Sequence, residues 1–255
     1  MKILAKIIQV ALILLAIATY QMNKAGKFST VQTSASNPQT VTVTPEPSVS
    51  SAKVQKPQAG ASHLEVPQGS GFDFYVLSLS WSPSFCLAKG AESDPAQCRS
   101  QRPFDFIVHG LWPQNERGYP EGCSSQDYPN REQIRSISDI TPSAGLVRHE
   151  WEKHGACSGL SVDDYFEVMH QARARVNIPA QFVHPMQDFS LSPNAVENVF
   201  IRANPGLNSN AISTACSYGD LSEVRICLTI DLAFHACPEV DRDGCRSKQV
   251  TIPAP

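Results

Sequence analysis

The chain has 255 residues, of which 42% are hydrophobic and 18% are charged, a balance typical of one or two globular domains. This composition excludes a wholly disordered chain and a fibrous repeat. Residues 1–67 hold six Lys and two Glu, a net charge of +4, whereas residues 68–255 hold 15 Lys and Arg and 22 Asp and Glu, a net charge of −7. An acidic body argues against a protein that coats long nucleic acids through a broad basic face, but it is compatible with an enzyme that holds a few nucleotides in a locally basic cleft.

The N-terminus has the pattern of an export signal. Lys2 and Lys6 precede an apolar run from Ile7 to Ala18, which fits a signal-peptide core and is shorter than the ~20 residues that span a bilayer. Ala16-Ile17-Ala18 fits a small-residue cleavage motif, so residues 1–22 are expected to be a signal peptide. If the apolar run extends to Met22, a signal anchor is the alternative. Either form exports the rest of the chain to the periplasm or the medium, where disulfides persist.

Residues 23–67 are expected to form a disordered linker. Ser, Thr, Pro and Gln fill 20 of the 34 positions in residues 29–62, which contain no aromatic residue. Such a segment cannot bury enough apolar surface to offset its ordering entropy. Residues 68–255 are long enough to bury roughly 70% of their unfolded surface, so we expect them to form one folded domain with a single core.

Two strands are predicted early in this body. The first runs from Phe72 to Trp81, where aromatic and branched residues dominate and alternate residues from Tyr75 onward share one face. The second is the apolar run from Phe104 to His109, which ends at Gly110. His109 is therefore expected at a strand terminus.

Helix starts follow from capping residues. Thr141-Pro142 places a capping hydroxyl before a proline at the first helical position, and predicts a helix to about His154 with Gly155 as its left-handed stop. Ser161 opens a second helix, which ends before Pro179. The apolar stripe of this second helix contains Tyr165, Phe166, Met169 and Ala172.

The remaining predicted elements are a helix from Ser192-Pro193 to Ala203 and a late strand from Val224 to Leu232. Strands and helices are mixed without regular alternation, which favours an α+β fold over a doubly wound sheet. All eight cysteines lie within the body, as expected for an exported domain stabilised by disulfides.

Two segments carry candidate chemistry. Residues 106–114 (FIVHGLWPQ) contain His109, and residues 149–157 (HEWEKHGAC) place two His, two Glu and one Lys within six residues of the predicted helix. An isolated His is more often a partly buried side chain bonded to backbone, but this clustering favours function. The histidines that lack such a pattern are interpreted as structural: His63, His170, His184 and His235.

A zinc site is the first alternative, because HEWEKH is superficially similar to the HExxH pattern of metalloproteases. That pattern needs two His four residues apart on one helix face. His149 and His154 are five apart, or about 140° around the helix, and cannot form this clamp. The pairs that share a face are His149 with Lys153 and Glu150 with His154, which suit a phosphate anion and proton transfer. No metal or other cofactor is expected.

Phosphate chemistry without a metal needs an acid, a base and cationic donors beside the developing negative charge. Two His, one Lys and one Glu meet this need, and a ribose 2′-hydroxyl is an internal nucleophile that such a set can activate. Trp112 and Tyr119 offer faces on which a base can stack, although each aromatic can equally be a core or loop anchor.

Together the two segments resemble the active-site segments of the ribonuclease T2 family. The likeness extends upstream to LSLSWSPSFC and downstream to ICLTIDLAFHAC, and covers roughly residues 72–245. It implies an exported, metal-independent endoribonuclease with an α+β fold, in which helices flank a central antiparallel sheet. Its expected products from single-stranded RNA are 2′,3′-cyclic phosphates and then 3′-phosphates.

The resemblance also implies roles for individual residues. His154 is expected to be the base on the 2′-hydroxyl, and His109 the acid for the leaving 5′-oxygen. Because an unperturbed His has a pKa of about 6.5, the rate is expected to trace a bell that peaks between mildly acidic and neutral pH. The other expected site residues are Glu150 and Lys153, which stabilise the pentacoordinate phosphorus, His149, which holds the phosphate, and Trp112, Gln114 and Tyr119, which contact a base.

Two positions depart from the family pattern. Gln114 stands where the family often has an acidic or another polar residue near the base, and Ala156 replaces a common Thr. Ala156 is not one of the expected proton carriers. With Trp112 as a stacking face that any base can use, weak discrimination among bases is expected.

Counting alone leaves many pairings of eight cysteines open. The resemblance implies that the second pair ties the helix bearing His154 to the loop after His109, which would fix the two halves of the site together. The four pairs that it implies are Cys86–Cys98, Cys123–Cys157, Cys216–Cys245 and Cys227–Cys237.

Two alternatives to an enzyme stay open. One is an inactive family member that acts as an exported binding or signalling protein, against which the presence of both His109 and His154 argues. The other is a disulfide-stapled binding module without turnover. For the enzyme, we expect RNA as a substrate without a stable nucleic-acid complex, and a monomer with no membrane contact beyond an N-terminal anchor, if one is retained.

Overall fold

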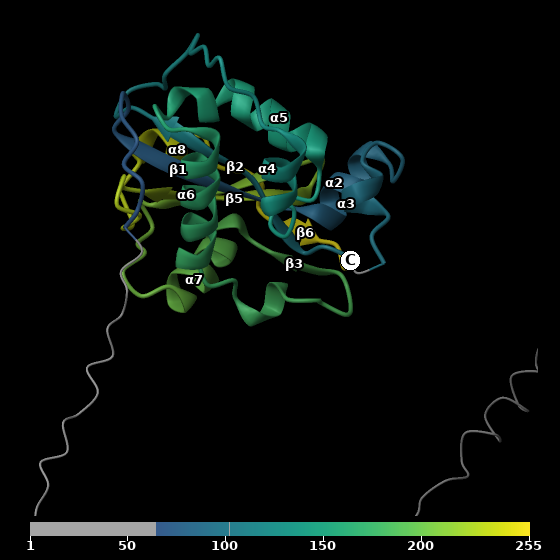
Figure 1. Cartoon of the computed structure of the whole chain (residues 1–255). Helices are drawn as coiled ribbons and strands as arrows, with labels where there is room; N and C mark the ends of the chain where they lie inside the picture. Colours follow the sequence, from purple (N-terminus) through teal and green to yellow (C-terminus); the bar gives the residue numbers. More distant parts are fainter. Residues whose placement is uncertain (1–64, 102) are drawn as a thin grey trace, which may run out of the picture. The chain divides into compact units, whose positions relative to one another are not determined.

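The computed structural model of the chain describes residues 65–101 and 103–255 (Figure 1). The expected export signal lies outside these residues, as does the expected linker up to residue 64. The described part mixes helices and strands without regular alternation, which confirms the predicted α+β class. None of the helices in this part is long and apolar enough to cross a bilayer.

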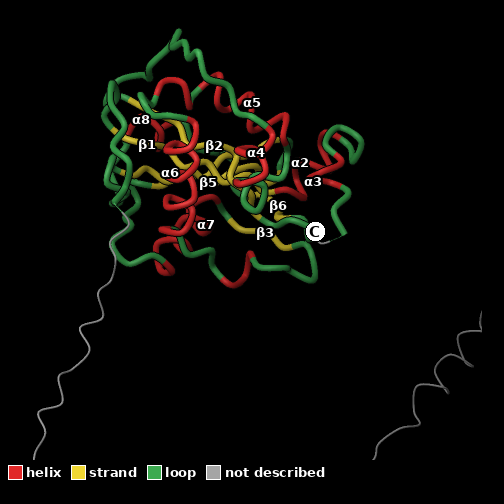
Figure 2. The backbone as a smooth tube through the Cα atoms, viewed as in Figure 1, coloured by secondary structure: helices red, strands yellow, loops and turns green. Residues whose placement is uncertain are grey.

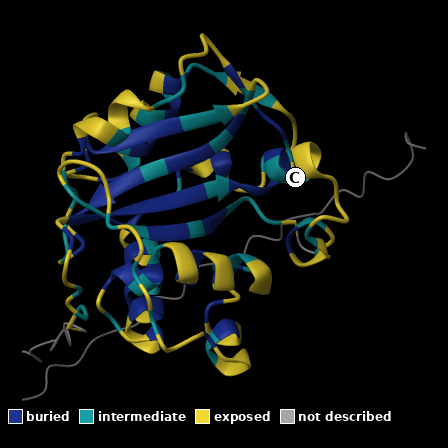
Figure 3. Ribbon diagram, turned by 90° about the horizontal axis from the view of Figure 1, so that it is seen from above, coloured by how far each residue is buried: buried dark blue, intermediate teal, exposed yellow. Residues whose placement is uncertain are grey.

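A six-stranded sheet forms the centre of the described part (Figure 3). Its order is β2-β1-β5-β6-β3, and β4 also pairs with β5. Neighbouring strands are antiparallel except β5 and β6, which are parallel where Asp220 pairs with Thr251. The sheet is therefore mixed rather than purely antiparallel, because the connection through α8 is long enough for a crossover. The strands are β1 Phe74–Trp81, β2 Phe106–Gln114, β3 Phe189–Leu191, β4 Ile212–Ser217, β5 Asp220–Leu228 and β6 Val250–Ile252.

Helices and loops surround this sheet, as the backbone trace shows (Figure 2). Two short 3-10 turns, Gly155–Cys157 and Ala180–Phe182, follow helical or extended segments. The helices are α2 Ser82–Lys89, α3 Pro95–Cys98, α4 Arg131–Ser136, α5 Ala144–Lys153, α6 Val162–Arg175, α7 Pro193–Ala203 and α8 Pro238–Arg242.

The central strand β1 is buried on both faces. Its alternate residues from Tyr75 to Trp81 belong to the large apolar cluster that also holds buried side chains of α5, α6 and α7, as their shared face predicts. Phe74 and Val76 point to the opposite face, where they pack with Cys227 and with partly buried Trp112. The two faces of one strand thus separate the main core from the side of the sheet on which the candidate site lies.

His109 lies in a β-bulge within β2, and not at the end of the strand as the sequence predicts. β2 continues to Gln114, and Ser78 of β1 pairs with Gly110 while the next residue, Leu79, pairs with Val108, so His109 is the extra residue. Residues three apart on a regular strand face opposite sides. The bulge offsets this alternation, so that His109 and Trp112 lie on the same side of the sheet.

Helix α5 starts and ends differently from the prediction. Its cap is Ser143, whose Oγ accepts from the Leu146 N–H, whereas the Thr141 hydroxyl donates to the Val108 carbonyl and ties the segment to β2. Gly155 is not a left-handed stop. A Cβ on Gly155 would lie 3.0 Å or less from the rings of Trp151 and Tyr165, so close packing explains this glycine.

The later elements follow their caps. α6 and α7 begin after Ser161 and Ser192, and each serine Oγ accepts a backbone N–H three residues on, as predicted. The late strand begins and ends four residues before its predicted bounds of Val224 and Leu232, since β5 covers Asp220–Leu228. The chain then turns at Leu232, which has a φ of 61°.

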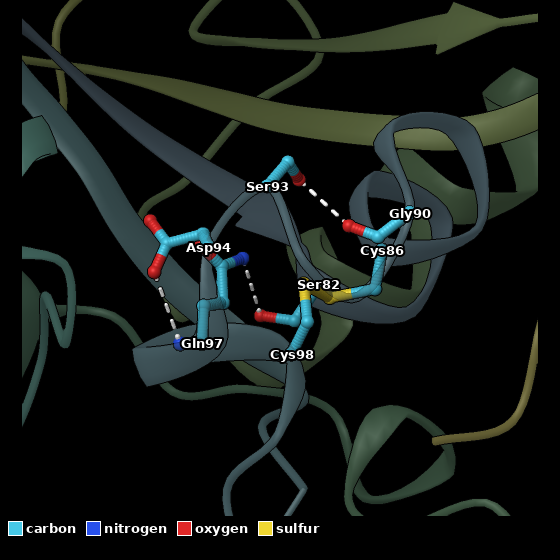
Figure 4. The surroundings of a disulfide bond; sticks show 7 residues. All are labelled: Ser82, Cys86, Gly90, Ser93, Asp94, Gln97 and Cys98. Carbon is cyan, nitrogen blue, oxygen red and sulfur yellow. Dashed lines mark hydrogen bonds between the residues drawn. A yellow bond between two sulfur atoms is a disulfide. The ribbon is translucent and has the colours of Figure 1, made fainter.

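Four disulfides join the eight cysteines in the pairs that the resemblance implies. Cys86–Cys98 links α2 to α3, beside the hydrogen bond from Gln97 to Ser82 (Figure 4). Cys123–Cys157 joins the loop after β2 to the 3-10 turn that follows His154. This link fixes the end of α5 relative to β2.

Candidate active site

Trp112 lies at the centre of a group of side chains from β2, β5 and α5. Its ring centroid is 5.5 Å from that of His109, edge to face, and 5.2 Å from that of His154, with 32° between the planes. The Arg225 guanidinium lies over the same ring, 5.3 Å from its centroid. The two histidines that the sequence predicts to work together therefore contact the same tryptophan ring.

Glu150 connects this tryptophan to His109. Its side chain is buried, and Oε2 accepts a 2.7 Å hydrogen bond from Trp112 Nε1 while Oε1 lies 3.4 Å from His109 Nε2. A Cβ at Gly110 would collide with both the Glu150 carboxylate and the Trp112 indole. Glycine is required there because the helix carboxylate approaches the strand backbone so closely.

His154 reaches Trp112 because it leaves the helix. It is the C-cap of α5, with φ −130° and ψ −51°, while its N–H still donates to the Glu150 carbonyl. The prediction that Glu150 and His154 lie together is met in that both side chains contact Trp112.

Glu223 and Arg225 of β5 complete the group and were not predicted from the sequence. His109 Nδ1 lies 2.5 Å from Glu223 Oε1, and Arg225 donates two hydrogen bonds, from Nε and an Nη, to Glu223 Oε2. A signal was present: Glu223 and Arg225 flank Val224, so two opposite charges share one face of the strand.

The surroundings move the pKa values of the two histidines in opposite directions. Burial lowers the pKa of His109, but its contacts with the Glu150 and Glu223 carboxylates outweigh burial and raise it to about 10. Burial lowers the pKa of His154, against the attraction of Glu150 and together with the repulsion of nearby positive groups such as His109 and Lys153. At neutral pH one imidazole is therefore charged and the other is neutral.

The two histidines line different cavities. Trp112, Gln114, Tyr119, His154 and Arg225 share a cavity of about 410 Å³, so the three predicted base contacts lie together beside His154. His109 and His149 line a larger cavity of about 870 Å³ with α2, α5 and the β4–β5 turn.

Lys153 is less central than predicted. It is exposed and borders a separate surface hollow with Cys123 and Trp151, although its charge still acts on His154. His149 is also exposed. The structure thus brings together His109, His154, Glu150 and Trp112, and leaves Lys153 and His149, the two side chains predicted to act on the phosphate, exposed outside this group.

Comparisons with known proteins identify the family of the chain. The model of the ribonuclease T2 family matches residues 72–237. A ribonuclease of Aeromonas hydrophila is 44% identical over 111 residues, which cover 43% of this chain and 49% of the relative. A probable ribonuclease of Haemophilus influenzae is 34% identical over 43% of the chain and 45% of its own length. These alignments span about half of each relative.

Other similarities cover more of the sequence. Ribonuclease I of Escherichia coli is 28% identical over 68% of this chain and 81% of its own length. Among solved structures, an RNase-related protein from Calystegia sepium superposes with a TM-score of 0.57 at 21% identity, over 72% of this chain and 98% of that one. A structure of RNase NT in complex with 5′-AMP superposes equally well, with a TM-score of 0.57 at 21% identity over 72% of this chain and 100% of that one. These superpositions support the same α+β fold.

Proposed function

The chain belongs to the ribonuclease T2 family, and from this membership we propose that it is an endoribonuclease that cleaves single-stranded RNA through attack of a ribose 2′-hydroxyl on the adjacent phosphorus. The observation that carries the proposal is the pairing of a charged His109 with a neutral His154 across Trp112. An acid and a base that are both ready at neutral pH are what this reaction requires.

In the first step, neutral His154 takes the proton of the 2′-hydroxyl as the O2′–P bond forms. Charged His109 gives its Nε2 proton to the 5′-oxygen as the P–O5′ bond breaks, and a 2′,3′-cyclic phosphate remains. In the second step the roles reverse: His109 takes a proton from water as it attacks phosphorus, and His154 returns a proton to O2′. The product is a 3′-phosphate.

The proposed charge stabilisation comes from side chains of β2 and α5 around the phosphate. His109 and Lys153 offset the negative charge that develops on the nonbridging oxygens, and His149 contributes from the rim of the larger cavity. Glu150 holds the Trp112 indole and faces His109 Nε2, so it keeps the acid directed at the phosphate before substrate enters.

Base binding is proposed for the 410 Å³ cavity that contains Trp112, Gln114 and Tyr119. The Trp112 ring already contacts His154 and lies beneath Arg225, so a base would stack mainly against Tyr119, which is 55% exposed. Stacking tolerates any base, which supports low base specificity.

We further propose that the enzyme is a monomer that binds RNA only transiently, in the periplasm or the medium. In the alternative, an inactive binding protein, His109 and His154 would take no part in catalysis. Their opposite charge states favour an enzyme instead, because RNA cleavage needs both an acid and a base.

The test uses the purified full chain with a short single-stranded RNA that carries one 2′-deoxy sugar, with and without EDTA. We expect cleavage at every ribose step, cyclic phosphate ends, and protection only at the 2′-deoxy step. EDTA should have no effect. Cleavage at the 2′-deoxy step, or loss of all activity with EDTA, would contradict internal attack by the 2′-hydroxyl.

A further inference from the structure

The carboxylate of Glu223 makes the shortest polar contact to His109. Its Oε1 lies 2.5 Å from His109 Nδ1, the ring nitrogen that faces away from Glu150, whereas Nε2 lies 3.4 Å from Glu150. An ionised carboxylate only accepts, so Nδ1 must carry the hydrogen. This contact leaves Nε2 as the nitrogen available to substrate and fixes the orientation of the ring.

Glu223 is itself held in place. It is 9% exposed, and its second oxygen accepts both hydrogen bonds from Arg225, at 2.9 and 2.8 Å. Burial would raise the pKa of Glu223, but His109 and Arg225 together lower it to about 2. The carboxylate is therefore charged and directed at His109 throughout the pH range in which the protein is expected to work.

The sheet explains how side chains of nonadjacent strands meet. His109 is on β2 and Glu223 on β5, and β1 runs between them. In the register of β1, Ser78 lies opposite Arg225, and Ser80 lies opposite Glu223. Two strands separated by a third are roughly 10 Å apart, so only small residues on β1 leave room for the imidazole and the carboxylate to touch above it.

We propose that Glu223 is a positioning residue for His109, with Arg225 fixing Glu223 in turn, so that β5 sets the orientation of the acid in RNA cleavage. This inference rests on the proposed function. Glu223 does not contact the scissile phosphate in this role. It acts by holding Nδ1–H, so that the proton given to the 5′-oxygen leaves from Nε2.

Titratable and charged groups from several elements lie around His109, and the proposal assigns Glu223 the largest effect on it. Glu150 and His149 come from α5, His154 from its C-cap, and Glu223 from β5, with Arg225 behind it. Glu150 is shared with Trp112, whereas Glu223 gives one oxygen to His109 alone among the described contacts. Removing the Glu223 charge should therefore have a large effect on the imidazole.

The experiment compares Glu223→Gln and Glu223→Ala in the full chain with a matched control, Asp139→Asn. Asp139 also pairs with a histidine, His170, at 3.0 Å, but it lies outside the site. By analogy with carboxylates behind metal-binding histidines, we expect kcat to fall about 10- to 100-fold in both Glu223 variants with little change in KM. Glu223→Gln should retain more activity than Glu223→Ala, because its amide oxygen can still accept Nδ1–H. The control should match the wild type.

The second readout does not depend on turnover. NMR titration of the His109 imidazole should show a pKa shifted to lower pH in Glu223→Gln and unchanged in Asp139→Asn. Unchanged titration and unchanged kcat in a folded Glu223→Gln variant would overturn the positioning role. If the wild type cleaves no RNA, the proposed function fails, while the titration still decides whether Glu223 controls His109.

Discussion

At the scale of single residues, the site gives two chemically identical side chains different pKa values through their different neighbours. His109 lies between two carboxylates, and His154 lies against an indole ring near positive groups. The bell-shaped dependence of the rate on pH, as predicted from the sequence, requires both histidines to have pKa values near the ordinary value of about 6.5. The structure instead raises the pKa of His109 and lowers that of His154, so that a charged His109 and a neutral His154 coexist over a wider pH range.

The pH dependence follows from the sign of each shift. kcat/KM should rise as His154 loses its proton, at a pH below the usual His value of about 6.5, and should fall only as His109 loses its proton, near pH 10. Between these limits we expect a plateau. A profile of kcat/KM from pH 4 to 11 measures it, and a sharp maximum near pH 6 would contradict the assigned charge states.

Gly110 gives a prediction about close packing. In Gly110→Ala the new methyl group would collide with the Glu150 carboxylate and the Trp112 indole, so their hydrogen bond must break or shift. We expect a loss of ~1–3 kcal/mol in the free energy of unfolding, together with a lower kcat.

Thermal or denaturant unfolding and RNA cleavage together measure the effect of Gly110→Ala. Gly145→Ala, within α5, is the matched control, because the atom nearest to a Cβ at Gly145 would be Ser143 Oγ, 3.8 Å away. This control should be neutral or slightly stabilising, because alanine is the better helix former. Wild-type activity in Gly110→Ala would show that the Glu150–Trp112 contact is dispensable.

At the scale of elements, the site depends on how the end of α5 is attached to β2. His154 is the C-cap of α5, and the 3-10 turn that follows ends at Cys157, which is bonded to Cys123 in the loop after β2. The bulge in β2 then turns His109 and Trp112 to the same side. Two local irregularities, a helix end and a bulge, thus place His109 and His154 against one indole.

The disulfide pair tests this attachment. Removing Cys123–Cys157 by a double Ala substitution should cost ~2–4 kcal/mol of stability and also lower kcat, because the position of His154 is loosened. The matched control removes Cys216–Cys245, whose cysteines are 29 residues apart in the sequence, compared with 34 for Cys123–Cys157. This control should lose similar stability and keep kcat close to that of the wild type. Unfolding curves and kinetics below the transition temperature separate the two effects. Equal kcat values in the two variants would contradict a role for the first disulfide in the site.

At the scale of the whole molecule, the described part carries the whole candidate site. The site residues all follow residue 100, and Val66 already packs against the large apolar cluster. Four disulfides are typical of proteins outside the cytoplasm, in the periplasm or the extracellular space. The N-terminal segment should therefore influence where the enzyme acts rather than how.

Deletion of residues 23–65 tests this division. We expect the shortened protein, secreted through its own signal, to have kcat and KM values for RNA within about twofold of the full chain, because no residue of the site is removed. Its unfolding midpoint should also be similar. A folded deletion variant without activity would show that the segment contributes to the site.

The sequence by itself determined the parts that depend on local pattern and residue chemistry. Serine caps specified the starts of α6 and α7, alternation specified the buried face of β1, and two short segments predicted that His109, His154, Glu150 and Trp112 lie together. Each of these signals is contained within a few neighbouring residues of the chain. Capping, alternation and helical spacing act over the same range.

Only the tertiary structure decided how these residues are charged and held. His109 and Glu223 are 114 positions apart, and their contact exists because β2 and β5 flank β1 in the sheet. The bulge that turns His109 toward Trp112 is a property of strand pairing, which no local pattern contains. The opposite pKa shifts of His109 and His154 follow from these contacts, because the charge of an imidazole depends on the groups that folding brings beside it.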